Sequence, residues 1–170
     1  MYKAKLFVGL ILTPNVNEID IYNQLESVYG EIEQKSSLYD FSHTTYYLDE
    51  MGKQLRKQFI VIKPLISTFS AYEQKLKAVK LESLFLKNNK RSVNIDPGFL
   101  TAHNVILLTT KNYAHRIPLN KNIFAELTYV FKQKKFIVLP WSYPDFARDD
   151  YKNFFEELRK KYLKESDRLK

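Results

Sequence analysis

The spacing of apolar and polar residues along this chain predicts most of its helices and strands. The run from Lys5 to Leu12 is almost entirely apolar, which is typical of a core strand. Asn17 suits a helix N-cap and Gly30 suits a C-terminal cap. Between these caps the apolar residues recur at helical spacing, at Ile19, Tyr22, Leu25 and Val28 or Tyr29. The pattern therefore predicts a strand followed by a helix of about four turns.

Two further strands and the start of a second helix are predicted next. Residues 31–41 have strand character, and Phe59 to Ile62 is a continuous β-branched and aromatic run. Pro64 marks the end of that run or an edge strand, because proline has no N–H to donate to a neighbouring strand. Ser70 and Glu73 have the spacing of a capping box, which predicts that a helix begins there.

The fold class follows from the order of these elements. The second helix is predicted to end near residue 87, and either Val93 to Ile95 or Val105 to Thr110 supplies the strand after it. The order β-α-β-β-α-β is that of a ferredoxin-like α+β core, in which both helices cover one face of a mainly antiparallel sheet.

A β-meander and a final helix are predicted to extend this core. The meander strands are separated by turns and run from His115 to Leu119, Ile123 to Phe131 and Phe136 to Trp141. The turn lengths predict that Arg116 lies opposite Glu126, and that Trp141 lies opposite Glu126 on its other side. From Arg148 onward the chain has the pattern of an amphipathic helix.

Composition favours one domain, residues 1–170, in a cytoplasmic setting. A chain of 170 residues with 45% hydrophobic content is long enough for one sizeable core. The apolar run Leu6 to Leu12 is far shorter than the roughly 20 residues that cross a bilayer, so no membrane association is expected. The absence of cysteine excludes disulfides and thiol chemistry.

The net charge of +8 is unevenly distributed along the chain. Residues 53–91 carry ten Lys or Arg against two Glu, whereas residues 1–52 carry three Lys against eight acidic residues. A basic face of this kind is one way to bind RNA. However, 21 of the 27 cations are Lys, which more often forms a solvated surface than a phosphate-binding site.

Polar residues near residue 94 are candidates for ligand binding. If residues 91–96 form one strand, Arg91 shares a face with Val93 and Ile95, while Asn94 and Asp96 share the other. Asn94 and Asp96 then suit a metal or a substrate hydroxyl. The structural alternative, favoured for Asp96, is that Asp96-Pro97-Gly98 is a turn.

The segment TTKNYAHRIPL, residues 109–119, follows an apolar run and concentrates candidate site residues. Lys111 and Arg116 suit an anion, which an arginine oriented by Glu126 binds bidentately. His115 suits acid/base catalysis because its unperturbed pKa is near neutrality. Within a strand His115 and Arg116 point to opposite faces, so both line one site only if the strand begins after them. The structural alternatives are a cross-strand ion pair and a hydrogen-bonded histidine.

Other chemical signals are weaker. Tyr47, beside Tyr46, and Trp141 have rings suited to stacking on a base or sugar, although such residues more often close a core. His43-Thr44-Thr45 is similar to the H-x-[ST] element of two-histidine phosphoesterases, but no second copy exists. No spacing of the three histidines predicts a metal site, and the sequence leaves any cofactor unknown.

The chain as a whole resembles an uncharacterised family, domain of unknown function 4416. The matching segments are LFVGLI at 6–11, YGEI at 29–32, Phe41-x-x-Thr44-x-Tyr46-Tyr47 with Glu50-Met51-Gly52, RSVNIDPGFLT at 91–101, LTTKNYAHRIPL at 108–119, AELT at 125–128 and LPWSYPDF at 139–146. The resemblance implies no activity, although some members are described as GTP-binding proteins. A P-loop GTPase is excluded, because the only Gly-Lys pair, Gly52-Lys53, lacks the first glycine and the following hydroxyl of the motif.

Three functions remain from the sequence. The first is a site at strand ends for a small-molecule or nucleotide-like anion, with Arg91, Asn94, Lys111 and Arg116 as binding residues and His115 and Glu126 as the catalytic pair. The second is an RNA-binding module that uses residues 53–91. The third is a non-catalytic protein-interaction domain.

Overall fold

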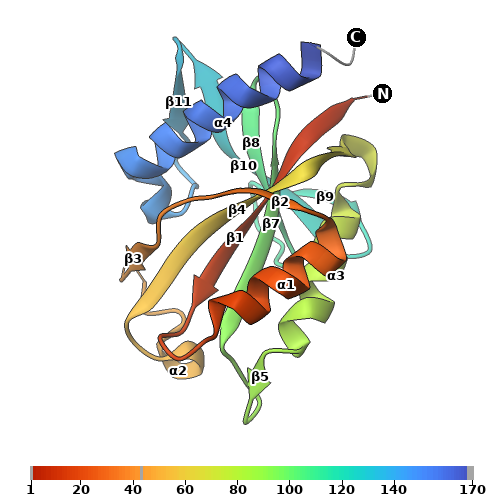
Figure 1. Cartoon of the computed structure of the whole chain (residues 1–170). Coiled ribbons are helices and arrows are strands. Elements are labelled where there is room, and N and C mark those ends of the chain that lie inside the picture. Colours follow the sequence, from red (N-terminus) through yellow and green to blue (C-terminus); the bar gives the residue numbers. More distant parts are fainter. Residues whose placement is uncertain (1, 43, 168–170) are drawn as a thin grey trace.

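The computed structural model describes residues 2–42 and 44–167, and Figure 1 shows a large twisted sheet with helices packed against it. The strands of the sheet are β1 (Lys3–Leu12), β2 (Ile32–Lys35), β3 (Tyr39–Phe41), β4 (Leu55–Ser67), β7 (Val93–Leu100), β8 (Asn104–Thr109), β9 (Ile117–Asn120), β10 (Ile123–Lys132) and β11 (Lys135–Val138). The helices are α1 (Glu18–Tyr29), α2 (Leu48–Met51), α3 (Tyr72–Ser83) and α4 (Asp149–Asp167), with 3-10 turns at Thr68–Ser70 and Pro144–Ala147. A short separate hairpin consists of β5 (Leu86–Lys87) and β6 (Lys90–Arg91).

The fold is α+β with an open, antiparallel sheet, as the sequence predicts. The strand order is β11-β10-β8-β7-β1-β4-β2, with β3 paired to β4 and β9 paired to β10. Every pairing in the described ranges is antiparallel. None of the helices in these ranges is long and apolar enough to span a membrane.

Helices cover both faces of β1, which explains why this strand is apolar at nearly every position. Leu6, Val8 and Leu10 pack into one core with α1 and α3. Phe7, on the opposite face, packs into a second, aromatic core with α4. The predicted final helix is confirmed, and its buried residues are Tyr151, Phe155, Leu158 and Tyr162.

Local capping explains where α1 begins and ends. Oδ1 of Asn17 accepts a hydrogen bond from the backbone N–H of Ile19 (3.1 Å). At the other end the N–H of Gly30 donates to the carbonyl of Glu26 (3.0 Å), with Gly30 at φ 101°, a conformation that favours glycine. Both predicted caps are therefore confirmed.

The predicted capping box of the second helix is wrong. Ser70 belongs to a 3-10 turn, and α3 begins after Ala71 without a side-chain cap. The helix also ends at Ser83 rather than near residue 87, because the chain turns back through the β5–β6 hairpin. Asn88 and Asn89 both adopt positive φ at the tip of this hairpin, a conformation that asparagine tolerates.

Two strand boundaries also differ from the prediction. Residues 31–41 form two strands, β2 and β3, which both pair with β4. Pro64 lies within β4 rather than at its end. The pairing with β1 shifts there, from Lys5 opposite Leu65 to Phe7 opposite Val61, so the proline lies at an irregularity that needs no regular hydrogen bond.

The predicted turn at Asp96-Pro97-Gly98 is wrong, because all three residues lie in β7 and pair with β1. Gly98 is required here by packing rather than by a turn. A Cβ at this position would lie 2.5 Å from Cζ of Phe7 and 2.6 Å from the carbonyl oxygen of Ile106. Both alternatives for the next strand are realised, as β7 and β8.

The meander register is confirmed in part. Phe131 pairs with Phe136 as predicted, and Pro118 pairs with Phe124, which agrees with a register that places Leu119 opposite Ile123. At the turn itself the prediction is wrong, because the register shifts between Ile123 and Phe124 and Ile123 pairs with Asn120. However, β8 occupies one edge of β10, so β9 and β11 share the other edge. The prediction that Arg116 and Trp141 flank Glu126 from opposite sides is therefore wrong.

Candidate ligand pocket

A pocket of about 340 Å³ opens where β7 and β8 separate. These strands pair only from Gly98 opposite Leu107 to Leu100 opposite Val105. The lining of the pocket comes from five parts of the chain and consists of Ile11, Phe41, Thr44, Tyr46, Tyr47, Asp96, Leu107, Lys111, Tyr143, Pro144 and Asp145. A recess of about 20 Å³ adjoins it, sharing Asp96, Leu107 and Tyr143.

Asp96 is the acidic group on the wall that the pocket and the recess share. It lies deep in the fold, yet 39% of its side chain is open to the pocket. Nζ of Lys75 donates to Oδ1 (2.8 Å) and Nδ2 of Asn94 donates to Oδ2 (2.6 Å). Burial by itself raises the pKa of Asp96, but Lys75, Asn94 and Lys57 outweigh it and lower the pKa below its usual value. Asp96 is therefore an ionised acceptor.

Two side chains of α3 form hydrogen bonds with the backbone of β7 at the point where β8 has separated from it. Oε1 of Glu82 accepts from the backbone N–H of Ile95 (2.6 Å), and Nζ of Lys75 donates to its carbonyl oxygen (2.8 Å). Side chains thus replace the hydrogen bonds that a neighbouring strand would supply. Lys75 is 5% exposed and belongs to the interior.

Arg91 connects Asp96 to α2. Its Nε and Nη2 donate to the two carboxylate oxygens of Glu50 in α2 (2.6 and 2.7 Å), and its Nη1 donates to Oδ1 of Asn94 (2.8 Å). The hydrogen bonds to Glu50 raise the pKa of Arg91 and lower that of Glu50. The predicted face of Arg91 is wrong, because Arg91 lies in β6 and Ser92 separates it from β7.

Tyr46 and Tyr47 form one wall of the pocket, and Lys111 lies at its rim. The two tyrosine rings meet edge to face, 4.9 Å apart. Lys111 donates to the hydroxyl of Tyr46 and lies 4.0 Å from the centre of its ring. Burial raises the pKa of Tyr47, and the nearby Asp96 and Tyr143 raise it further, so its hydroxyl stays protonated. The predicted binding residues Tyr47 and Lys111 therefore line the pocket.

Glu126 and Arg116 line the recess. Glu126 is 1% exposed, and its Oε2 accepts from Nε of Arg116 (2.8 Å) and lies 3.0 Å from Nε2 of His115. Because β9 begins only at Ile117, His115 and Arg116 precede the strand and both reach Glu126. The other carboxylate oxygen, Oε1, is buried and finds no hydrogen-bond partner in residues 2–42 and 44–167.

The guanidinium of Arg116 is largely engaged by the protein. Besides the bond to Glu126, its Nη1 donates to the carbonyl of Lys111 (2.9 Å) and its Nη2 donates to the hydroxyl of Tyr143 (3.0 Å). Burial lowers the pKa of Arg116, but Glu126 and Tyr143 outweigh it and raise the pKa. Arg116 thus fixes the walls of the recess.

His115 and Trp141 lie next to this cluster rather than in the pocket lining. Their rings stack with centres 5.6 Å apart at an interplanar angle of 14°. Nε1 of Trp141 donates to the carbonyl of Leu127 on the edge of β10 between β9 and β11 (2.8 Å). The two residues thus support Glu126 and β10 from outside.

Sequence reasoning missed a buried ion pair next to the pocket. Lys57 of β4 pairs with Asp145, and both side chains are less than 10% exposed. Nζ of Lys57 also lies 4.4 Å from the ring centre of Phe146. The signal lay in the segment LPWSYPDF, which the family resemblance singles out, since its residues Tyr143 and Asp145 both line the pocket.

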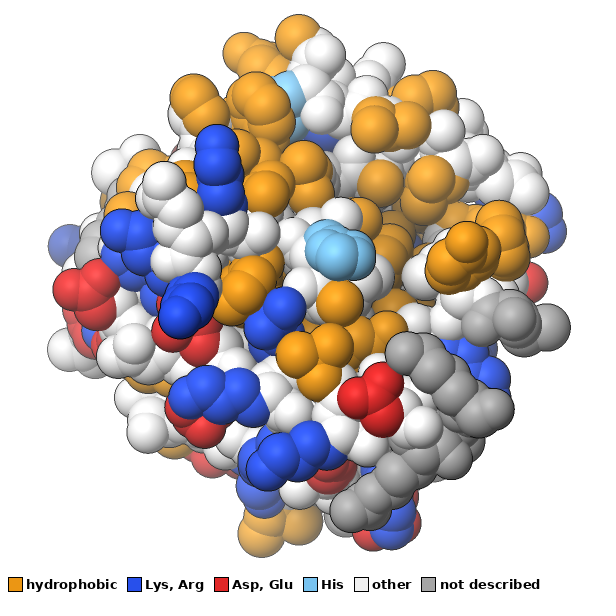
Figure 2. Space-filling view, turned by 90° about the horizontal axis from the view of Figure 1, so that it is seen from above, with side chains coloured by type: hydrophobic (Ala, Val, Ile, Leu, Met, Phe, Trp, Pro, Cys, Tyr) orange, Lys and Arg blue, Asp and Glu red, His pale blue; other side chains and the backbone are white. Residues whose placement is uncertain are grey.

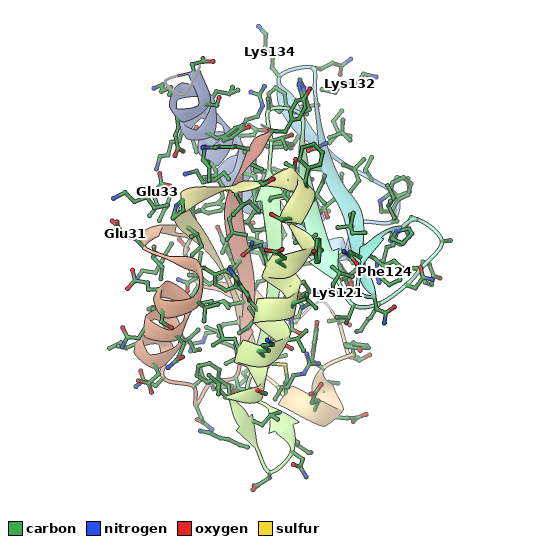
Figure 3. The ribbon with its side chains drawn as sticks, turned by 90° about the vertical axis from the view of Figure 1, so that its right-hand side faces the viewer. Glu31, Glu33, Lys121, Phe124, Lys132 and Lys134 are labelled. Carbon is green, nitrogen blue, oxygen red and sulfur yellow. The ribbon has the colours of Figure 1, made fainter. Side chains whose placement is uncertain are left out.

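The basic segment 53–91 is only partly exposed. Lys57 and Lys75 are buried in ion pairs, while Arg56 pairs with Glu18 and Lys63 pairs with Glu31. On the face seen in Figure 2, basic side chains lie next to acidic and hydrophobic ones. In Figure 3, other lysines, Lys132 and Lys134, project from the β10–β11 turn, far from Glu31 and Glu33 at the β2 edge.

Two further sequence-based expectations concern catalysis and metals. His43, of the H-x-[ST] element, lies outside the described residues. In residues 2–42 and 44–167 no three His, Asp or Glu side chains are close enough together to hold a metal ion.

Fold and pocket define a class, an antiparallel α+β protein with an aromatic pocket of small-molecule size. The chain belongs to the family described as Domain of unknown function (DUF4416), whose model matches residues 2–162. Comparison with curated proteins and with solved structures gave no significant match.

Proposed function

We propose that the pocket binds a nucleotide-like small molecule, with its ring among the tyrosines and its anionic group at Lys111. The observation that carries this proposal is the lining itself: Tyr46, Tyr47 and Tyr143 surround a space that has one accessible carboxylate, Asp96, inside and one lysine at the rim. A volume of about 340 Å³ is within the range of small-molecule sites.

The distribution of charge supports this orientation. Among the cations near the pocket, Lys57, Lys75 and Arg116 are each bound to a carboxylate, whereas Lys111 is exposed and its ammonium donates to the hydroxyl of Tyr46. Within the described residues Lys111 forms no ion pair, although it lies near enough to Glu50 to help lower the pKa of that carboxyl, so an anionic group meets an available positive charge at Lys111. Phosphate or carboxylate placed inside would instead meet the carboxylate of Asp96.

The other predicted site residues have positioning roles in this proposal. Arg91 and Asn94 hold Asp96 and α2, while Arg116 holds Glu126 and Tyr143. His115 and Trp141 support Glu126 from the side away from the pocket lining. The proposal is one of binding and assigns no reaction.

The experiment is calorimetric titration of the protein with common nucleosides and with their monophosphates. We expect one base to bind, and its monophosphate to bind about tenfold more tightly than its nucleoside, because a charge-assisted contact contributes about 1.5–3 kcal/mol. In Lys111→Ala the monophosphate loses this advantage while nucleoside affinity changes little.

Lys132→Ala is the matched control, since Lys132 is exposed at the turn end of β10. It removes the same charge and leaves the pocket intact. Equal losses of affinity in both variants would indicate general electrostatic attraction and contradict a site at Lys111. If no nucleoside or nucleotide binds, the proposal is wrong.

We also infer that β1, α1, β2, β4, α3 and β7 form a ferredoxin-like core. Support comes from the order β7-β1-β4-β2 with antiparallel neighbours, because in that fold the fourth, first, third and second strands lie side by side. The shared core of α1 and α3 on one face of β1 agrees with this topology. The extension from β8 to β11 then creates the pocket at its junction with β7.

A further inference from the structure

Within the proposed ligand site, Glu126 lines the 20 Å³ recess and has an unsatisfied hydrogen-bond acceptor. Oε1 of Glu126 is buried and has no hydrogen-bond partner among the described residues, while Oε2 of the same carboxylate is bound by Arg116 and His115. A buried acceptor without a donor costs about 1–3 kcal/mol, more when it is charged. The recess at Glu126 therefore requires a donor to complete it.

A second acceptor borders the same recess. Asp96 lines both the recess and the main pocket, and within the part of the chain that the structure describes each of its oxygens has one hydrogen-bond partner, Lys75 or Asn94. A carboxylate oxygen has two lone-pair positions, so both oxygens retain acceptor capacity. Tyr143, which also lines the recess, accepts from Arg116.

The size and charge of the recess restrict what it accommodates. Its volume of about 20 Å³ holds one water-sized group, such as an amino or hydroxyl group. Glu126 is balanced by Arg116 and Asp96 by Lys75, so a neutral donor fits better than an additional ammonium. The aromatic walls next to it suit the planar ring that would carry such a group.

From these observations we propose that the recess recognises an exocyclic amino group on the heterocycle of the bound ligand, which donates to Oε1 of Glu126 and to Asp96. This rests on the proposed function and deepens it, since it names the part of the ligand that enters first. The anionic group then remains at Lys111, at the mouth. Glu126 is thus a specificity-determining binding residue rather than a general base.

The test uses pairs of nucleoside monophosphates that differ by one amino group. Three such pairs are guanosine against inosine, adenosine against purine riboside, and cytidine against its analogue without the amino group. For the base that binds, we expect the amino form to bind at least about tenfold more tightly, because the analogue without the amino group leaves buried carboxylate oxygens unpaired. Calorimetry on the unmodified protein measures this ratio without any substitution.

A variant assigns the preference to Glu126. In Glu126→Gln the side chain keeps its size, but its uncharged amide has one acceptor oxygen and one NH₂ donor in place of two charged acceptor oxygens. We expect the preference for the amino form to fall to about threefold or less, because the coupling between the ligand amino group and the carboxylate is lost. Folding of the variant is checked by thermal unfolding, and if it does not fold, the ligand pairs on the unmodified protein decide.

Each outcome distinguishes the two proposals. If one base binds but its amino and deaminated forms bind equally, the recess holds only water, and this inference is wrong while the proposed function stands. A preference that persists unchanged in Glu126→Gln also contradicts it. If none of the monophosphates binds, the proposed function fails and the inference fails with it.

Discussion

Gly98 shows how a single residue allows β7 to cross an aromatic core. Its missing side chain leaves room for the ring of Phe7 from β1 and for the carbonyl of Ile106 from β8. Gly9 lies nearby in β1, but a Cβ there would make only ordinary contacts, the nearest at 3.4 Å to the carbonyl oxygen of Asp96. The two glycines therefore form a matched pair for testing packing.

We predict that Gly98→Ala lowers the free energy of unfolding by about 1–3 kcal/mol or more, because either the Phe7 ring or the β8 backbone must move. Gly9→Ala is expected to change it by less than about 1 kcal/mol. Urea denaturation of both variants measures the difference. Similar losses of unfolding free energy in the two variants would contradict the claim that close contacts require glycine at position 98.

Lys75 determines how Asp96 responds to pH. The folded protein lowers the pKa of Asp96 below its ordinary value of 3.8. Its contribution to stability is therefore fully present above that value and is lost as the pH falls through the lower folded pKa. In Lys75→Met the effect of burial is no longer opposed by the ammonium, so the folded pKa rises.

We predict that the pH dependence of stability changes sign in Lys75→Met. Above its raised pKa the ionised Asp96 destabilises the fold, so acidification toward about pH 4 should stabilise the variant relative to neutral pH, unlike the unmodified protein. Urea unfolding at a series of pH values measures this. Lys80→Met, on an exposed part of the same helix, should follow the pH dependence of the unmodified protein.

At the scale of elements, α2 depends on its neighbours to hold the aromatic wall. It has only four residues, too few for a stable isolated helix, and Arg91 binds Glu50 bidentately from β6. Lys90 adds a hydrogen bond to the carbonyl of Asp49 (3.0 Å). The conformation of Tyr46 and Tyr47 thus depends on the β5–β6 hairpin.

We predict that Arg91→Lys loosens α2 while the core stays folded, because lysine lacks the planar fork that matches both carboxylate oxygens. Hydrogen exchange of residues 44–52 should become about tenfold faster or more, with little change in the midpoint of global unfolding. Lys63→Ala, which breaks the exposed pair with Glu31, is the control and should leave this segment unchanged. Unchanged exchange in Arg91→Lys would contradict the role of the bidentate contact.

At the scale of the whole molecule, what could be predicted from sequence was local. Asn17 and Gly30 cap α1 through neighbouring backbone groups, and short turns set the register of β9, β10 and β11. The failed prediction at Asp96-Pro97-Gly98 depended on a distant residue, Phe7, whose ring requires a glycine. Local turn preference could not reveal this.

The pocket was only partly predictable for the same reason. Arg116 and Glu126 were found because the short turn between their strands let the register be derived, and Lys111 was found because it lies in the same short segment as Arg116. Asp96 and Tyr143 come from distant parts of the chain, and only the separation of β7 from β8 brings them together. Buried partners such as Lys57 had no sequence signal that distinguished them from surface lysines.

The most direct test of the central claim is amide chemical-shift mapping by NMR during titration with nucleoside monophosphates. The account predicts that the largest shifts fall on pocket residues from separate segments, Tyr47, Asp96, Leu107, Lys111 and Tyr143, and that they saturate together. Shifts confined to the lysines of residues 53–91, or no saturable shifts at all, would contradict a ligand pocket between β7 and β8.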